Sequence, residues 1–306
     1  MDVEELSRNR SLRLGIIGLS SGNGHPYSWS AIFNGYDPVA MATCPFPAIP
    51  SYLAKQHFPA DAIAGAKVTH VWTQDPSVTE HISKASLVPN MVRNLEQMLE
   101  EVDAVLLARD DAENHLKYSE KFLAAGLPIY IDKPIALKRA DLFRLLDRQQ
   151  YPGQIFSCSA LRYAEEFNLT ASDRAQLGPV RHIQAITPKS WSKYGVHLID
   201  PVLAMFDLYR TDCSVWRTSS GLPETITVNW EGLTASFLCT GELPADIRIR
   251  LFGELGNAER VFSDSFTAFK SALERFVRSI RLSTEETTAS ELEAMVSILE
   301  RGAIEG

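Results

Sequence analysis

Short apolar runs alternate with amphipathic stretches over the first half of the chain. Runs in which nearly every position is apolar predict strands buried on both faces, at 12–18, 38–44, 67–73, 102–108 and 128–132. Apolar residues spaced three and four apart predict helices between them, at 27–35, 77–86, 90–100 and 112–126. Strands that alternate with helices indicate βαβ units, and therefore a parallel sheet with helices on both faces.

Beyond about residue 150 the pattern changes to strands that follow one another. Alternating polar and apolar positions predict them at 154–162, 180–187, 213–219, 223–230, 233–240 and 246–252. One helix, 196–209, interrupts this series, and two amphipathic helices, 265–281 and 288–301, follow it. Consecutive strands favour a largely antiparallel sheet. We therefore expect an α/β fold, with a doubly wound domain over 1–150 and an α+β domain over 151–306.

The chain of 306 residues is acidic, since 30 Lys and Arg against 38 Asp and Glu give a net charge of −8. Nucleic acids and anionic membranes bind clustered cations, and the sequence has no basic block, so we expect neither as a partner. No apolar run approaches the roughly 18 residues of a membrane helix, and the first residues are charged, so we expect a cytoplasmic protein. The four cysteines are far apart, so we expect no disulfide and no metal site.

A loop of small residues follows the first predicted strand and runs from Gly18 to Gly24. In a dinucleotide-binding fold, such a turn lets backbone N–H groups approach a pyrophosphate, with the next helix N-terminus facing it. The pattern G-x-G-x-x-G is not met literally, because Ser20 and Asn23 stand at its later glycine positions. The alternative is a plain tight turn. The loop predicts cofactor contacts from Gly18, Ser20, Gly22, Asn23 and Gly24.

The acidic residue that grips a ribose hydroxyl in such folds is missing from the end of the second predicted strand. Thr43 and Cys44 stand there, followed by Pro45, and we expect Cys44 at the cofactor. No arginine replaces the acid to favour a 2′-phosphate. The choice between NAD and NADP therefore stays open, and so does a weakened or lost cofactor site.

A charged pair, Asp132-Lys133, follows the fifth predicted strand and precedes Pro134. The carboxyl end of a buried parallel strand is where open α/β sheets place ligands. Pro134 restricts Lys133 to extended conformations, which aims its side chain away from the strand end. An ammonium there can hydrogen-bond a ribose or a substrate hydroxyl and stabilise a developing alkoxide. The alternative is a solvated lysine with Asp132 as a helix cap.

The order of elements and this tripeptide resemble the Gfo/Idh/MocA oxidoreductase family, whose members carry [ED]-K-P at this place. The resemblance extends from Leu12 to the last helix. It implies an N-terminal Rossmann domain and a C-terminal domain with an open sheet. The segment 109–115 also resembles the family's segment after the fourth strand, which implies cofactor contacts from Arg109 and His115. Here the charged Arg109-Asp110-Asp111 replaces the usual turn of small residues and proline.

In the resembled family, the first helix of the second domain carries a histidine that relays the substrate hydroxyl proton, and His197 matches it. An aspartate often stands four residues before that histidine, where this chain has Lys193. A neighbouring ammonium disfavours imidazolium, so the relay would run through neutral imidazole, or Lys193 or Tyr194 would transfer the proton. Asp200 lies one turn along the helix and could orient His197. The alternative for His197 is a packed, partly buried side chain.

Two further pairs are candidate substrate contacts. Arg162 could clamp a carboxylate or phosphate, and Tyr163 could stack on a ring, whereas an interdomain ion pair is the alternative for Arg162. Trp191 and Tyr194 could line a sugar-binding or aromatic pocket, with core packing as the alternative.

The resemblance implies an enzyme that transfers a hydride between NAD or NADP and the carbinol carbon of a sugar, polyol or related cyclic alcohol. Lys133 would polarise the oxygen, and His197, with Lys193 and Asp200, would handle the proton. A lyase or cyclase that keeps a tightly bound nicotinamide, or a binding protein with a degenerate cofactor site, are the alternatives, because a fold does not fix a function. A homo-oligomer, dimer or tetramer, is expected from the resemblance.

Overall fold

The computed structural model describes residues 10–218 and 221–303, and the chain divides into two compact units. The first unit comprises 1–132, 145–157 and 272–287. The second comprises 133–144, 158–271 and 288–306. The expected division at residue 150 falls inside a segment of the first unit, so each unit takes chain from both sides of it. The roles expected for the two domains stay predictions.

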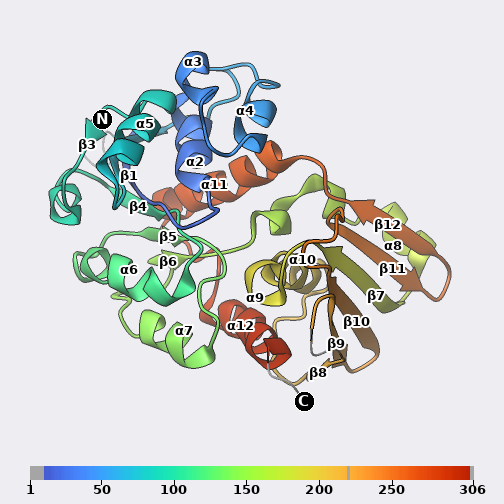
Figure 1. Cartoon of the computed structure of the whole chain (residues 1–306). Coiled ribbons are helices and arrows are strands. Elements are labelled where there is room, and N and C mark those ends of the chain that lie inside the picture. Colours follow the sequence, from blue (N-terminus) through green and yellow to red (C-terminus); the bar gives the residue numbers. More distant parts are fainter. Residues whose placement is uncertain (1–9, 219–220, 304–306) are drawn as a thin grey trace, which may run out of the picture. The chain divides into compact units, whose positions relative to one another are not determined.

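The first unit is built on a sheet of six parallel strands in the order β3-β2-β1-β4-β5-β6 (Figure 1). The strands are β1 (Leu12–Ile17), β2 (Ala66–Trp72), β3 (Asn90–Met91), β4 (Ala104–Leu107), β5 (Ile129–Ile131) and β6 (Ile155–Phe156). This is the strand order of a Rossmann fold, in which the chain reverses direction across the sheet between β1 and β4. The α/β expectation for this part of the chain is confirmed.

Helices cover both faces of this sheet. Helices α2 and α5 contact β2, α6 contacts β4 and β5, and Figure 1 shows them on opposite sides of the strands. The elements are α2 (His25–Asn34), α3 (Pro38–Met41), α4 (Ala48–Leu53), α5 (Pro76–Ala85), η1 (Leu95–Met98), η2 (Ala112–Asn114) and α6 (His115–Ala124). Helices α7 (Arg139–Leu146) and α11 (Ser265–Leu282) have residues in both units.

The strand predicted at 38–44 is wrong, because this segment begins with the helix α3. Asp37 caps the helix by accepting the Ala40 N–H, and Pro38 fixes φ at the first helical position. Local capping therefore overrides the apolar pattern. The strand that pairs with β1 at this place of the sheet is β2.

Two other predicted elements are wrong in extent. The segment predicted as a helix at 90–100 holds the short edge strand β3 and the 3₁₀ turn η1, which Asn94 caps through the Gln97 N–H. Of the strand predicted at 154–162, β6 alone forms, and it pairs with β5 in the first sheet. The 3₁₀ turn η3 (Ala160–Tyr163) ends the run, with the Ser159 hydroxyl accepting the Leu161 N–H.

An aromatic cluster fixes the end of the first sheet that leads to Asp132. Tyr130 on β5 stacks on Trp29 of α2 with ring centroids 4.8 Å apart, and Phe156 of β6 meets it edge-on at 4.7 Å. Phe276 of α11 packs against both Tyr130 and Phe156. All four rings are buried, and each contributes about 1.5–3 kcal/mol of hydrophobic stabilisation.

The second unit has a six-stranded sheet in the order β12-β11-β7-β10-β9-β8. The strands are β7 (Val180–Thr187), β8 (Ser214–Arg217), β9 (Glu224–Trp230), β10 (Leu233–Cys239), β11 (Arg248–Gly253) and β12 (Asn257–Val261). The pair β7 and β10 is parallel and the other pairs are antiparallel, which confirms the mostly antiparallel sheet. Strand β12 was not predicted, and residue 219 of the predicted 213–219 lies outside the described residues.

Helices α10 and α12 pack on this sheet, contacting β7 and β8. The helices of the unit are α8 (Ala171–Leu177), α9 (Trp191–Tyr194), α10 (Val196–Phe206) and α12 (Ala289–Ala303), with the 3₁₀ turn η4 (Glu165–Phe167). Trp191 Nε1 donates to the carbonyl of Leu299, and the ring leaves no room for a Cβ on Gly302. This packing joins α9 to α12. Within 10–218 and 221–303, no helix has both the length and the apolar content needed to cross a membrane.

Candidate functional site

The glycine loop lies between β1 and α2, at the point of the sheet where Rossmann folds bind their ligands. Gly18 is required by packing, since a Cβ there would lie 2.3 Å from Cγ of Pro26. Gly22 has φ +80° at the exposed tip, and a Cβ built on it would meet nothing within 4 Å. Open space therefore adjoins the loop at its tip.

Three side chains that follow the neighbouring strands β2 and β4 hold the loop. The Gln74 amide makes two hydrogen bonds with the backbone of Leu19, accepting its N–H and donating to its carbonyl. Arg109 Nη1 donates to the same carbonyl at 3.1 Å and to Gln74 Oε1 at 2.9 Å. The Ser20 hydroxyl is bonded to Asp110. These contacts fix the loop without a ligand.

The start of α2 offers little to a phosphate. Asn23 Oδ1 accepts the His25 N–H, Pro26 has no N–H, and the Tyr27 N–H bonds the carbonyl of Gly24. Gly24 is buried, and a Cβ there would lie 2.6 Å from Ile49 and 2.7 Å from Phe46. A dinucleotide fits this loop through the open tip at Gly22, whereas the helix N-terminus is already capped.

Because 38–44 is not a strand, the expected ribose-binding position is the one that follows the actual second strand of the sheet. The second strand in the sheet is β2, and Thr73, Gln74 and Asp75 follow it. Asp75 caps α5, and hydrogen bonds from Ser77 lower its pKa. Cys44 lies buried in the turn after α3 and not at the end of a strand, and burial raises its pKa. Its contact with the cofactor stays a prediction.

The segment after β4 is held together by its own charges. Arg109 donates from Nε and Nη2 to both carboxylate oxygens of Asp111 and lies over the Tyr118 ring. His115 is fully buried, and its Nε2 bonds the carbonyl of Arg109. Arg109 therefore supports the glycine loop, and cofactor contacts from Arg109 and His115 stay predictions.

Asp132, at the end of β5, is buried and joins a residue that the sequence analysis missed. Its Oδ2 accepts Asn23 Nδ2 at 2.8 Å and lies 2.6 Å from Nδ1 of His25. The His25 ring stacks on Trp29 with centroids 4.9 Å apart. A histidine at the first position of the helix after a glycine loop was the signal that could have pointed to it.

In the second unit, Lys133 and His197 both lie against Tyr194. Lys133 Nζ is 5.7 Å from the centroid of the Tyr194 ring, and the His197 ring meets that ring edge-on with centroids 4.9 Å apart. Lys133 and His197 are 6% and 8% exposed, so both polar groups are largely out of water. Tyr194 thus brings together two residues 64 positions apart in the sequence.

His197 is oriented by Ser159, which the sequence analysis also missed. The Ser159 hydroxyl lies 2.8 Å from Nδ1 of His197 and accepts the Leu161 N–H at 3.3 Å. Asp200 was expected to contact His197, but its Oδ2 accepts the Ser159 N–H at 2.7 Å. Asp200 therefore acts on His197 through Ser159.

Because the Ser159 hydroxyl is buried, its proton needs an acceptor in the protein. Its partners are His197 Nδ1 and the Leu161 N–H, and only Nδ1 can accept. Neutral His197 therefore carries its proton on Nε2. No spacing in the sequence identifies the serine that pairs with the motif histidine, because the path of the chain through a strand and a turn places Ser159 beside His197.

Arg162 is held by anions within its own unit. Its side chain is 8% exposed, lies 3.5 Å from Asp200 and 2.6 Å from Glu291, and bonds the hydroxyl of Tyr209. Burial acts to lower its pKa, but the neighbouring charges, Asp200 first, raise it overall. Burial also raises the pKa of Asp200, while Arg162 acts against this. A contact between Arg162 and substrate stays a prediction.

The remaining candidates have simpler surroundings. Trp191 is a core residue, 1% exposed and packed on Phe237. Tyr163 is partly exposed in η3, next to Arg162. Lys193 is exposed on α9. Their substrate or proton-transfer roles stay predictions.

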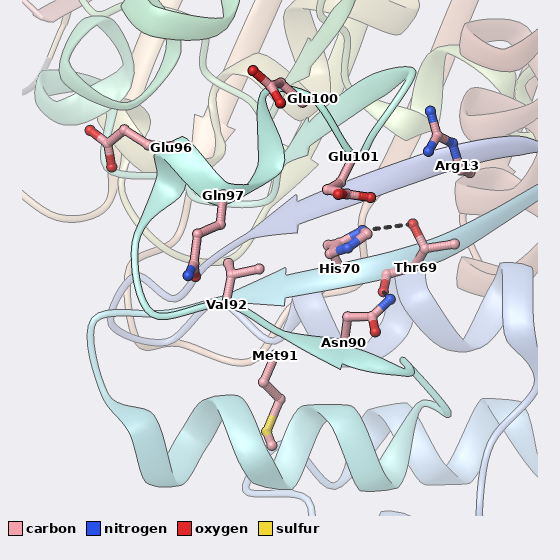
Figure 2. A pocket seen from close by; sticks show the side chains of 10 residues that line it. All are labelled: Arg13, Thr69, His70, Asn90, Met91, Val92, Glu96, Gln97, Glu100 and Glu101. Carbon is pink, nitrogen blue, oxygen red and sulfur yellow. Dashed lines mark hydrogen bonds between the residues drawn. The ribbon is translucent and has the colours of Figure 1, made fainter.

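A hollow of about 730 Å³ lies elsewhere on the first unit, beside the edge strand β3 (Figure 2). Arg13, His70 and Asn90 line it together with Glu96 and its neighbours, and none of its lining residues is a candidate site residue. This hollow therefore does not coincide with the candidate site residues.

Comparison with known proteins shows a family match for part of the chain. Residues 49–159 match the model of the GFO_IDH_MocA oxidoreductase family, NAD-binding Rossmann fold. A putative UDP-kanosamine synthase oxidoreductase subunit of Amycolatopsis mediterranei (strain S699) is 25% identical over 109 residues, which are 36% of this chain and 30% of that protein. The match thus spans less than a third of that relative.

Solved structures match over nearly the whole chain. Myo-inositol 2-dehydrogenase from Lactobacillus plantarum has a TM-score of 0.71 at 15% identity, over 95% of each chain. Scyllo-inositol dehydrogenase from Lactobacillus casei, with bound NAD(H) and scyllo-inositol, has 0.68 at 14%, over 94% of each. This likeness shows the fold. Residues 49–159 thus match the NAD-binding Rossmann domain of the Gfo/Idh/MocA oxidoreductase family, and the chain has the fold of these dehydrogenases.

Proposed function

We propose that the protein is a nicotinamide-dinucleotide-dependent oxidoreductase that acts on the carbinol carbon of a sugar, polyol or related cyclic alcohol. The observation that carries the proposal is the placement of Lys133 and His197 against the Tyr194 ring. An ammonium and an imidazole that share one largely buried place suit a reaction in which an alcohol oxygen changes charge.

Lys133 and His197 have different roles in the proposed reaction. Lys133 attracts the substrate oxygen and stabilises the alkoxide character that develops when the C–H bond breaks. His197, with Nε2–H as donor, hydrogen-bonds the same oxygen and orients the carbinol. The buried network behind it, Ser159, Asp200 and Arg162, keeps the imidazole in place.

When bound, the dinucleotide supplies the hydride acceptor or donor. The loop tip at Gly22 would hold its phosphates, with Gln74 and Arg109 supporting the loop. The choice between NAD and NADP stays open, since Asp75 at the end of β2 is engaged as a helix cap. The names of the fold relatives, two inositol dehydrogenases, support a cyclic polyol as the first substrate class to test.

The test is a spectrophotometric assay of reduced nicotinamide with each dinucleotide and a panel of inositols and sugars. We expect turnover by the wild type and a loss of about 100- to 10,000-fold in kcat/KM for Lys133→Met. Lys84→Met, at an exposed lysine in the last turn of α5, is the control and should match the wild type. Full activity of Lys133→Met would remove the proposed role of this lysine.

Binding experiments separate the rival functions. Tryptophan fluorescence titrated with NADH and NADPH should report binding of at least one of them. A dinucleotide retained through dialysis without net redox turnover would favour a lyase or cyclase, and no response to either would favour a ligand-binding protein. The homo-oligomer and the cytoplasmic location implied by the sequence stay predictions, the former testable by light scattering after size exclusion.

A further inference from the structure

Two basic side chains of the second unit contact one aromatic ring. Lys133 Nζ lies over the Tyr194 ring, 5.7 Å from its centroid, and the His197 ring meets it edge-on at 4.9 Å, with 71° between the planes. Tyr194 is partly exposed on the short helix α9, whereas Lys133 and His197 are largely buried. The ring is thus a common neighbour of both groups that the proposed function needs.

The contacts of the two basic groups favour a single positive charge, on Lys133. An ammonium and an imidazolium in one largely buried place repel each other, so a second positive charge is costly there. The face of an aromatic ring attracts a cation, and this attraction is larger where water is excluded. His197, by contrast, accepts the Ser159 proton on Nδ1, which its protonated form could not do. The arrangement therefore pairs a cationic Lys133 with a neutral His197.

The backbone that carries Tyr194 is anchored on both sides. The Trp191 N–H donates to Oε2 of Glu224, which is 9% exposed, and Trp191 Nε1 donates to the carbonyl of Leu299. At Gly195, where α9 meets α10, a Cβ would lie 2.6 Å from the carbonyl oxygen of Trp191. Helix α9 is thereby tied to β9 and α12, which fixes the place of the Tyr194 ring.

The hydroxyl of Tyr194 takes no part in these contacts. It has no hydrogen bond to another residue within 10–218 and 221–303. Tyr209 shows the opposite case in the same unit, because Arg162 lies over its ring at 5.1 Å and also bonds its hydroxyl. A proton relay through a phenol runs along hydrogen bonds, and the described side chains provide none at Tyr194.

We propose that Tyr194 is a positioning residue of the candidate active site, and that it acts through its ring and not through its hydroxyl. The inference rests on the proposed function. The ring holds the Lys133 ammonium and the His197 imidazole where both reach one substrate oxygen, and it keeps the positive charge on Lys133. The proton transfer that the sequence left open for Tyr194 is then not its role.

Two substitutions at Tyr194 separate the ring from the hydroxyl. Tyr194→Phe keeps the ring and should have kcat and KM within about 3-fold of the wild type. Tyr194→Leu removes the ring and should lower kcat about 10- to 100-fold, because a lost cation–π contact and displaced basic groups weaken the stabilisation of the transition state. The NADH dissociation constant, measured by fluorescence titration, should stay within about 3-fold in both variants. If circular dichroism shows that Tyr194→Leu does not fold, Tyr194→Met is the second variant without the ring.

Phe143→Leu is the matched control. Arg139 lies over the Phe143 ring at 5.6 Å, so this substitution removes a contact of the same kind, at a ring that is 40% exposed. Its kinetics should match those of the wild type. A loss in Tyr194→Phe equal to that in Tyr194→Leu would assign the role to the hydroxyl and overturn the proposal. Wild-type kcat in Tyr194→Leu would overturn it as well, and a raised KM alone would show a ring that only binds substrate.

A second measurement needs no turnover. The ring current of Tyr194 shifts the NMR signals of the His197 ring protons, which histidine labelling and His197→Gln assign. Tyr194→Leu should move these signals, whereas Tyr194→Phe and Phe143→Leu should leave them nearly in place. Unchanged His197 signals in Tyr194→Leu would overturn the proposal. A wild type without dinucleotide-dependent turnover contradicts the proposed function instead, and the His197 signals then decide whether the ring positions the imidazole.

Discussion

The Ser159 hydroxyl lies 2.8 Å from Nδ1 of His197 and donates its proton there. This single bond decides which nitrogen of the motif histidine is the acceptor, and therefore what His197 can do toward a substrate. Asp200 stabilises the arrangement by accepting the N–H of Ser159. Asp200 thus acts on the motif histidine through Ser159. In the resembled family, by comparison, an aspartate often stands four residues before that histidine.

Ser159→Ala should remove the preference of neutral His197 for a proton on Nε2. We expect a loss of about 1 kcal/mol in the free energy of unfolding and a mixture of tautomers at His197 in ¹⁵N NMR. Ser157→Ala is the matched control, because the Ser157 hydroxyl is buried and has no hydrogen-bond partner in the described part of the chain. That variant should be neutral or slightly stabilising in denaturant unfolding. Equal effects of the two variants would argue against the assigned bond.

Arg162→Met should destabilise the protein strongly. The substitution leaves the buried carboxylate of Asp200 and the partly buried one of Glu291 without their cation, which costs about 3–5 kcal/mol. Arg181→Met removes an ion pair with Glu254 in which both side chains are about half exposed, and should cost under about 1 kcal/mol. Urea unfolding of both variants measures the difference. A small effect at Arg162 would show that the buried network contributes little.

The lowered pKa of Asp103 leads us to expect that stability depends on pH. Burial acts to raise its pKa, but hydrogen bonds from Arg10 and Arg13 outweigh this and hold it at about 2, below the ordinary 3.8. The stabilisation is therefore present above the ordinary value and lost as the pH falls through the folded value. Because both arginines are more than one-third exposed, we expect about 1 kcal/mol.

The measurement is urea unfolding of the wild type and Asp103→Asn between pH 5 and the acid range, at about 0.05 and 0.5 M salt. The stability difference between the two proteins should shrink toward acid pH and at high salt. A difference that is independent of pH would contradict the assigned ion pairs.

Gly22 and Gly24 should respond differently to alanine. At Gly24 a Cβ would collide with Phe46 and Ile49, so Gly24→Ala should cost about 1–3 kcal/mol of stability. At Gly22 there is room for a methyl group, and the strain of φ +80° costs about 1–2 kcal/mol. Gly22→Ala should mainly weaken NADH binding, because the methyl group fills the open space beside the loop. Thermal unfolding and fluorescence titration compare the two, and unchanged NADH affinity in Gly22→Ala would place the phosphates elsewhere.

The sequence predicted most strands and helices of both sheets, because their patterns are periodic and long. It failed at 38–44, where the Asp37 cap and Pro38 form a helix from an apolar run. Because of that error, the ribose-binding position was expected at Cys44, whereas the strand that pairs with β1 is 66–72. A local pattern does not show which strand pairs with which.

For the site, the motif identified Lys133 and His197, and the structure places both against one tyrosine. It could not identify Ser159 or His25, whose roles depend on contacts across 38 and 107 positions of sequence. Arg109 and Arg162 looked like ligand-binding cations in isolation. Their carboxylate partners show that both are engaged in the fold.

The central claim is that Lys133 and His197 act on one substrate oxygen beside a nicotinamide. A crystal structure of the protein with NADH and a bound inositol tests it most directly. We predict that Lys133 Nζ and His197 Nε2 both lie about 3 Å from the oxygen on the carbon nearest C4 of the nicotinamide ring. A dinucleotide whose ring lies away from both side chains, or a substrate oxygen contacted by neither, would contradict the account.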